Sequence, residues 1–331
     1  MISKQMRKKE ENKINKNILF TIAYYNALDY QPTTFYVWKY LIFVTGNVEK
    51  VGLNKIILAL TDLQKKQKII EKNGFWQLNI FGNNLTGKQE QKILKKRVKL
   101  QIQKNKISTA KLQRARKWMN VIGWLPYLRG MILMGTLALK RGGINSDWDV
   151  LVMTKKGRIW LGRLILTTWL QFLRKRRHGD RIQDRFCLNQ FITDGSLQFQ
   201  EHNEFASNEI LFSRCLGREK NVYNDLLRNN IKWIKKNKPN FILRNLNSEE
   251  EIFSWQNKIK IFLENLLEMF GLASLLNKIS KKIMIRKIIN NPKTYTSQAD
   301  IRYGDFFLIF LPYPQRDVIR RKTLQLLTKI T

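Results

Sequence analysis

Two aspartates with one residue between them, Asp147 and Asp149, stand at the start of a short apolar run, Val150 to Val152. Such a run is typical of a buried strand, and side chains alternate across a strand, so both carboxylates are predicted to point to one face. Carboxylates that share a face repel one another unless a proton or a cation lies between them. A hard divalent ion with oxygen ligands is the usual solution, so the spacing predicts a Mg²⁺ site at Asp147 and Asp149.

A second feature that could take part in chemistry is Gly135-Thr136, which ends the apolar run Met131 to Met134. A glycine lets backbone N–H groups approach a phosphate closely, and the threonine hydroxyl can add a hydrogen bond. Metal-binding carboxylates opposite a phosphate-binding turn are the arrangement that phosphoryl and nucleotidyl transfer require. The alternative is a plain strand and turn with two surface aspartates, and Asp-x-Asp by itself does not exclude it.

Gly135-Thr136, ten further residues and then Asp147-Trp148-Asp149-Val150 resemble the nucleotidyltransferase signature of the DNA polymerase beta superfamily. Residues 157–161 and 184–189 are similar to segments of uncharacterised bacterial proteins with a nucleotidyltransferase domain, and the resemblance covers roughly residues 115–245. It implies an α+β fold with a mixed-sheet core, a nucleoside triphosphate substrate and Mg²⁺ as cofactor. It also implies that Gly135 and Thr136 bind the β and γ phosphates.

Active members of that superfamily place a third carboxylate on a later strand, and this sequence offers no obvious one. The next predicted strand, Phe186 to Thr193, carries Asn189 on the face that strict alternation assigns to Cys187 and Phe191. An amide ligates a metal weakly and cannot act as a general base. Asp184, just before that strand, is the substitute catalytic candidate, and a capping role at the strand start is its alternative.

Basic residues follow the Asp-x-Asp strand in a turn that contains Lys155 and Arg158. We expect this turn at the carboxyl end of the strand, where a triphosphate could reach both side chains, and they are therefore candidate nucleotide ligands. A solubilising loop is the alternative interpretation of the same residues.

The charge balance favours polyanionic partners. The 331 residues include 61 Lys and Arg against 25 Asp and Glu, which gives a formal net charge of +36. Such an excess suits a nucleotide or a nucleic acid, although a coding bias toward Lys, Asn and Ile also contributes to it. The length allows two or three domains with cores of their own.

Cysteine and histidine usage excludes some chemistry. Cys187 and Cys215 have no metal-ligand or redox spacing and the two histidines lie far apart, so zinc and Ser-His-Asp sites are poorly supported. A reducing cytoplasm is expected, since no secretory signal is visible. The most apolar run, Ile159 to Leu173, is shorter than a bilayer span, and we expect a helix on the sheet rather than a membrane partner.

The first part of the chain has the pattern of three helices followed by a hairpin at Asn73-Gly74. This order is similar to a winged helix, in which the third helix, here about 51–67, would contact DNA. Its outward residues include Lys55 and Lys65, the candidate DNA ligands. A packing or protein-contact module is the alternative.

These patterns predict two possible functions. The first is a metal-dependent nucleotidyltransferase that moves a nucleoside monophosphate from an NTP to an unidentified acceptor. The second is a DNA-binding regulator or nucleotide sensor whose transferase domain has degenerated. The predicted parts are a flexible basic arm at 1–16, a winged-helix-like domain at 17–82, a basic helical linker at 83–114, the nucleotidyltransferase domain at 115–245 and a helical carboxy-terminal region at 246–331.

Overall fold

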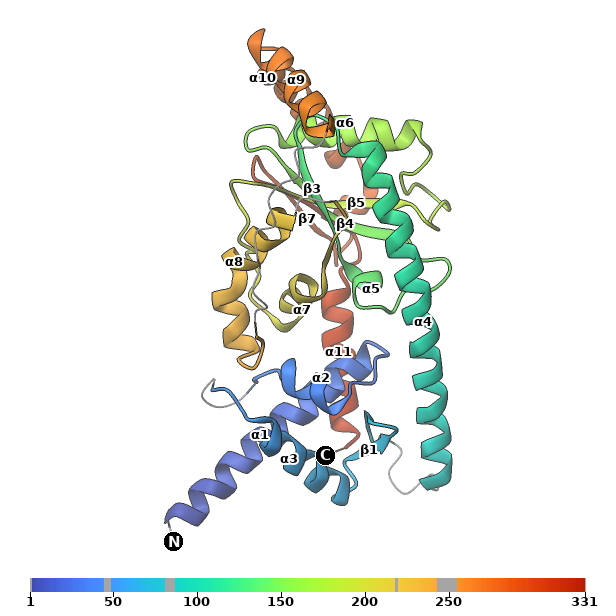
Figure 1. Cartoon of the computed structure of the whole chain (residues 1–331), viewed down its shortest axis with the longest axis vertical. Coiled ribbons are helices and arrows are strands. Elements are labelled where there is room, and N and C mark those ends of the chain that lie inside the picture. Colours follow the sequence, from blue (N-terminus) through green and yellow to red (C-terminus); the bar gives the residue numbers. More distant parts are fainter. Residues whose placement is uncertain (1, 45–48, 81–86, 218–219, 243–254, 331) are drawn as a thin grey trace.

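A mixed β-sheet lies at the centre of the chain in the computed structural model, which describes all residues except 1, 45–48, 81–86, 218–219, 243–254 and 331 (Figure 1). In this described part, six strands pair in the order β6-β3-β4-β5-β8-β7. Only β4 and β5 run parallel; the other neighbours are antiparallel. The strands are β3 (Leu128–Leu133), β4 (Trp148–Thr154), β5 (Phe186–Thr193), β6 (Arg214–Cys215), β7 (Asp300–Tyr303) and β8 (Phe307–Leu311).

Both faces of the sheet are covered, which explains the nearly continuous apolar sequence of β4. Trp148, Val150 and Val152 share one core cluster with residues of α4 (Gly87–Ile122), α6 (Ile159–Phe172) and α10 (Leu272–Ile289). Leu151 and Met153 point the other way, into a cluster with residues of α8 (Lys220–Asn237). The short helix α7 (Glu204–Phe212) packs against α8 on that side. Asp149 is the one charged residue of β4, and alternation places its side chain on the same face as Leu151 and Met153, where α7 and α8 lie.

The N-terminal unit consists of the expected three helices and hairpin. Its elements are α1 (Ile2–Ala27), α2 (Thr34–Lys39), α3 (Leu53–Lys65), β1 (Ile69–Lys72) and β2 (Phe75–Leu78). Thr33 caps α2 by accepting a hydrogen bond from the Tyr36 N–H at 3.3 Å. Asn73 and Gly74 both have positive φ, 52° and 81°, as a two-residue hairpin turn requires. Residues 2–16 of the expected flexible arm are helical and form the first part of α1.

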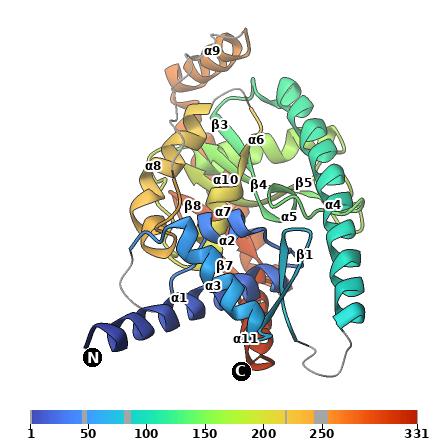
Figure 2. The same ribbon diagram turned by 60° about the horizontal axis from the view of Figure 1, so that its bottom comes forward.

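The C-terminal region departs from the expectation of a purely helical segment. After α9 (Trp255–Met269), α10 and the short 3₁₀ helix at Pro292–Tyr295, the chain adds β7 and β8 to the central sheet. The last helix, α11 (Gln315–Thr328), then packs against α1, where Ile330 enters the core of the N-terminal unit. Figures 1 and 2 show this contact at the end of the molecule where both termini lie.

One further boundary differs from the expected one. Helix α4 continues without a break across the boundary expected at residue 114, so the predicted linker is part of a helix that packs on the sheet. The boundaries expected at residues 82 and 245 lie outside the described residues. Because α11 joins the N-terminal core, the chain does not separate into units that are consecutive in sequence.

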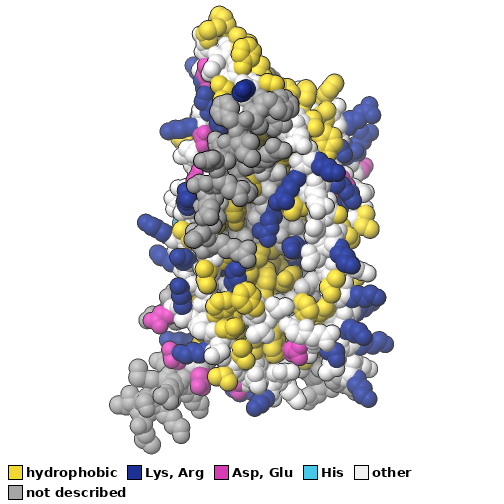
Figure 3. Space-filling model, in the orientation of Figure 1, with side chains coloured by type: hydrophobic (Ala, Val, Ile, Leu, Met, Phe, Trp, Pro, Cys, Tyr) yellow, Lys and Arg dark blue, Asp and Glu magenta, His cyan; other side chains and the backbone are white. Residues whose placement is uncertain are grey.

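Helices α9 and α10 form the end opposite the termini, where apolar side chains are exposed (Figure 3). Met269 is 70 % exposed and Phe270 65 % exposed at the turn between the two helices. Lys and Arg side chains are spread over the same face of the molecule (Figure 3). Among the described residues, no helix is both long enough and apolar enough to cross a membrane.

Candidate functional site

The predicted pair of aspartates does share one location. Asp147 immediately precedes β4, and Asp149 lies at its start, where it pairs in register with Cys187 of the parallel strand β5. One ligand atom from each of Asp147, Asp149 and Cys187 lies within 4.8 Å of the others. This is the geometry of a site that could hold a metal ion, and the two carboxylates come from the predicted residues.

The charges of this cluster are only partly balanced. Burial, and then the charge of Asp147, raise the pKa of Asp149 to about 6. The Nη1 of Arg177 lies 2.7 Å from an Asp147 carboxylate oxygen and 3.3 Å from the sulfur of Cys187. Burial and the two carboxylates raise the pKa of the Cys187 thiol, so Cys187 stays neutral near pH 7. A half-buried carboxylate pair with a single guanidinium is a favourable place for a further cation.

Gly135 fits closely against Asp149 at the end of β3. Its φ is +66°, and a Cβ built there would lie 2.7 Å from the Asp149 Oδ2 atom. A larger residue would therefore both strain the backbone and displace the carboxylate. Thr136 follows in α5 (Gly135–Ala138). It is exposed and lines a cavity that Asp147 and Asp149 also line. The glycine and the Asp-x-Asp pair are thus in contact, as the sequence predicted.

Glu209 is a carboxylate near this turn that the sequence analysis missed. Its Oε2 accepts a hydrogen bond from the Gly135 N–H at 3.3 Å, and the residue lines the same cavity. Burial, and then the charge of Asp149, raise the pKa of Glu209 to about 7. The available signal was a second acid in α7, after Glu204 of its first turn, placed between the buried residues Asn208 and Ile210.

A cavity of about 1480 Å³ joins these groups. It is large enough for a nucleoside triphosphate with a second small molecule. Its walls come from both faces of the sheet, with Glu209 of α7 on one side and Arg163 of α6 on the other. The basic side chains that line it are Arg141, Arg163, Arg176, Arg177, Lys287, Lys293, Arg302, Arg316 and Lys322. Positive charge therefore surrounds the carboxylates.

The structure does not bring Asp184 to this cluster. Its carboxylate lies 2.8 Å from the Lys111 ammonium and 2.5 Å from the Arg114 guanidinium, both on α4. Lys111 also donates to the Ser146 carbonyl at 2.8 Å. With φ at +51°, Asp184 turns toward α4 rather than toward Asp149. These bonds fix the loop before Asp147 to the long helix, which is a positioning role.

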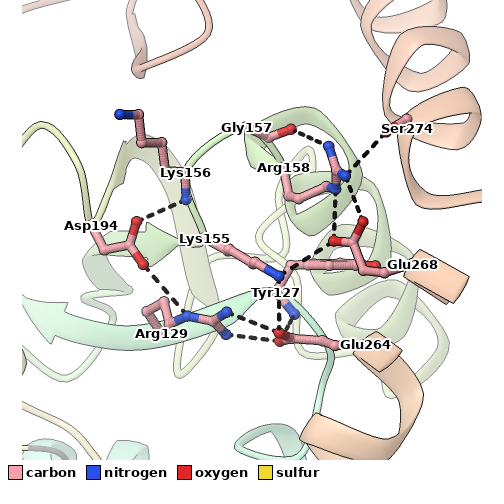
Figure 4. A network of polar contacts seen from close by, with 10 residues as sticks. All are labelled: Tyr127, Arg129, Lys155, Lys156, Gly157, Arg158, Asp194, Glu264, Glu268 and Ser274. Atoms are coloured by element: carbon pink, nitrogen blue, oxygen red, sulfur yellow. Dashed lines mark hydrogen bonds and ion pairs between the residues drawn. The ribbon is translucent and has the colours of Figure 1, made fainter. Parts of the chain in front are cut away.

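Lys155 and Arg158 also lie away from the carboxylates, because Asp149 is at the start of β4 and Lys155 follows its end. At about 3.3 Å per residue, the two ends are roughly 20 Å apart. Figure 4 shows both basic side chains directed to α9, where Arg158 lies 2.6 Å and Lys155 3.3 Å from Glu268. The Arg158 guanidinium holds the pKa of Glu268 below its ordinary value. The turn does lie at the carboxyl end of β4, as expected, but the carboxylates that would bind the metal lie at the other end of the strand.

Strict alternation along β5 also failed. The pairing of β4 with β5 shifts register between Asp149 and Leu151, where Leu151 pairs with Gln190. As a result Cys187 lies on the Asp149 side, whereas Phe191 packs into the opposite cluster with Val152. Asn189 lies within the shift and lines the cavity. The irregularity separates residues that a regular strand would place on one face.

Lys55 and Lys65 are exposed on α3, in the N-terminal unit, and do not line the cavity. Two apolar side chains of the same helix are exposed as well, Leu58 at 71 % and Ile57 at 43 %. The buried residues of α3 are Ile56, Leu60 and Leu63.

The chain was compared with protein-family models, with curated proteins and with solved structures, and none of them matches it.

Proposed function

We propose that this protein is a metal-dependent nucleotidyltransferase that transfers a nucleoside monophosphate from an NTP to the hydroxyl group of an acceptor. The observation that carries the proposal is the contact between Gly135 and Asp149, in which a phosphate-binding type of turn meets a carboxylate pair. Neither feature is specific by itself, but together they provide both halves of a nucleotide site.

The donor set fits a hard divalent cation. Asp147 and Asp149 offer carboxylate oxygens, which Mg²⁺ prefers, and burial together with the charge of Asp147 raises the pKa of Asp149. Cys187, with its neutral thiol, is a poor ligand for Mg²⁺. When bound there, the cation would neutralise the carboxylates and polarise the phosphate oxygens.

Two arginines beside this site suit the triphosphate. Arg177 is partly engaged with Asp147, and a nucleotide phosphate could take over that guanidinium once a cation neutralises the carboxylate. Arg141 lines the cavity and lies next to the turn, since its backbone N–H donates a hydrogen bond to the Thr136 carbonyl at 2.8 Å. Its Nε atom is buried and has no hydrogen-bond partner among the described residues. Gly135, Thr136, Arg141 and Arg177 are the proposed phosphate ligands.

Glu209 takes the proton in this proposal, the role that the sequence assigned to Asp184. The acceptor oxygen forms a bond to the α phosphorus, the bond from that phosphorus to the bridging oxygen breaks, and pyrophosphate leaves. The hydroxyl proton passes to Glu209, whose pKa of about 7 suits a base at neutral pH. The Gly135 N–H released by that carboxylate can then bind a phosphate oxygen.

The test uses the purified full chain with each of the four labelled NTPs and Mg²⁺. We expect one NTP to bind and Asp149→Asn to weaken that binding at least about tenfold, as loss of a charge-assisted contact predicts. The variant should fold, because it removes a carboxylate that Asp147 repels. Asp180→Asn, an exposed acid in the loop before β5, is the matched control. Equal NTP binding by both variants would disprove the proposed site.

A second candidate is a nucleotide sensor, which binds an NTP without turnover. It is favoured by one observation, that β5 presents a neutral thiol rather than a carboxylate beside Asp149. Binding that depends on Asp149, with no pyrophosphate release for any acceptor tested, would support the sensor. DNA contact through Lys55 and Lys65 of a winged-helix-like unit stays a proposal for either candidate.

A further inference from the structure

Arg163 of α6 lines the cavity on the face of the sheet opposite to Asp149. Its guanidinium carbon lies 3.9 Å from the ring centre of Phe310 and 5.4 Å from that of Phe191. These two rings belong to β8 and β5 and pack with the α6 cluster. The stacked guanidinium is held in a fixed plane, yet its buried Nη1 atom has no hydrogen-bond partner among the described residues.

A second polar group without a partner lies one helical turn away. Thr167 lines the same cavity, and its hydroxyl is buried without a hydrogen bond. Threonine in a helix commonly bonds the carbonyl four residues earlier, as Thr323 of α11 does with Ile319. Because residues four apart share one helix face, Thr167 and Arg163 present two unsatisfied donors to one place.

A third donor comes from Arg176, in the segment that leads from α6 to β5. Arg176 is partly buried, lines the cavity and lies near enough to Arg163 for its charge to lower the pKa of that guanidinium, although burial lowers it more. Within the described residues, neither arginine takes part in an ion pair with a carboxylate. Two neighbouring cations with unused donors are costly unless an anion binds between them.

This place is separate from the proposed triphosphate ligands. Gly135 and Glu209 lie on the α7 side of the sheet, whereas Phe191 and Phe310 support Arg163 on the α6 side. Residues of both places nevertheless line the same cavity. A molecule held at Arg163 could therefore extend a second group toward the carboxylates.

We propose that Arg163, Thr167 and Arg176 form a second anion site, which binds a phosphate group of the acceptor in the proposed transfer reaction. That the bound molecule is the acceptor rests on the proposed function, whereas the binding of phosphate at this site does not. A phosphate group offers several oxygens to a planar guanidinium, a hydroxyl and a second guanidinium. The acceptor is then a small phosphorylated molecule with a free hydroxyl group.

The other arginines of the cavity argue for one compact anion rather than a nucleic-acid backbone. Arg302 is paired with Asp300 at 2.7 Å and with Glu201 at 3.1 Å, and Arg316 also pairs with Glu201. Their charges are therefore already balanced. A backbone would need a row of available cations. The two buried guanidinium groups that have a donor without a partner in the described part of the chain, Arg141 and Arg163, lie at separate places, the first beside the Gly135 turn.

The experiment measures inorganic phosphate binding to the full chain by titration calorimetry, beside binding of the NTP with Mg²⁺. Arg163→Gln and Arg176→Gln should each weaken phosphate binding about tenfold or more, since each removes a charge-assisted contact. Thr167→Val should weaken it less. Both arginine variants should keep their NTP affinity within about twofold, and Arg181→Gln, an exposed arginine outside the cavity, should change neither.

Each outcome decides the inference. Unchanged phosphate affinity in both Arg163→Gln and Arg176→Gln overturns it, and Arg176→Gln keeps the test valid if the other variant unfolds. Tighter Arg163-dependent binding of succinate than of phosphate would assign the site to carboxylates and also overturn it, as would Arg163-dependent binding of an unphosphorylated single-stranded oligonucleotide. Arg163-dependent phosphate binding by a protein that binds no NTP would leave the anion site standing and remove the proposed function.

Discussion

Cys187 lies directly beside Asp149 on the adjacent parallel strand, so that β5 contributes a sulfur atom to the carboxylate pair. The sequence offered no obvious carboxylate on this strand, only Asn189, with Asp184 just before the strand as the substitute candidate. Here the third carboxylate near the pair is Glu209, which comes from a helix and reaches Gly135 instead. A substitution at Cys187 therefore tests directly whether β5 faces the metal site.

Cys187→Asp should create a third carboxylate in the cluster. Without a divalent cation, the added charge should lower the melting temperature, because Asp147 and Asp149 already repel one another. With Mg²⁺ the variant should be stabilised more than the parent, since three carboxylates bind a dication more tightly than two. Thermal unfolding with and without Mg²⁺ measures both effects, and Cys215→Asp, outside the cluster, is the control. A variant that Mg²⁺ stabilises no more than the parent would show that β5 does not face the metal site.

Glu209→Gln should flatten the dependence of stability on pH. A carboxyl whose pKa rises from the ordinary 4.5 to about 7 on folding binds more protons in the folded state between those values. Its contribution to stability is complete below about pH 4.5 and is lost as the pH rises to about 7. Asp149 has the same sign over a lower range, up to about pH 6, so the interval from pH 6 to 7 reports on Glu209. Denaturant titrations at pH 5, 6 and 7 should give a smaller loss for the variant; equal losses would exclude the inferred proton uptake.

Arg158→Gln should affect stability and leave nucleotide binding unchanged. Arg158 is bonded to Glu268 through two nitrogens, at 3.1 and 2.6 Å, and also to the Ser274 hydroxyl. Such a partly buried, bidentate pair is worth about 1 kcal/mol or somewhat more. We expect a loss of that size in the free energy of unfolding, measured in denaturant, and an unaltered NTP affinity. A weakened NTP affinity would restore the original assignment of Arg158 as a nucleotide ligand.

Ile330→Ala should destabilise the N-terminal unit, although the residue is at the other end of the sequence. Ile330 is 7 % exposed in the core formed by α1, α3 and the hairpin, so truncation should cost about 2–4 kcal/mol. Leu324→Ala, on α11 but 49 % exposed, is the matched control and should cost well under half as much. Hydrogen exchange of α1 amides measures the effect where it is expected. Equal protection of α1 in the two variants would mean that α11 is not part of this core.

The sequence by itself was sufficient for features that depend on neighbours along the chain. The turn at Gly135 and the Asp-x-Asp pair meet because they lie at the paired ends of β3 and β4, which are adjacent antiparallel strands connected by residues 134–147. The hairpin at Asn73-Gly74 follows from the positive φ that these two residue types tolerate. The apolar run from Ile159 to Leu173 likewise predicted the helix α6 on the sheet.

Features that depend on distant segments were decided only by the tertiary structure. Glu209 and Arg177 reach the pair because α7 and the segment before β5 fold back onto β4, and no local pattern encodes that approach. The register shift in β5 places Cys187 and Phe191 on opposite faces of the sheet, whereas regular alternation would place both on one face. Lys155 and Arg158 are close to Asp149 in sequence yet lie at the far end of an extended strand, where α9 supplies their partners. An extended strand separates residues further per position than any other regular structure, and burial on both faces fixes which face each side chain takes.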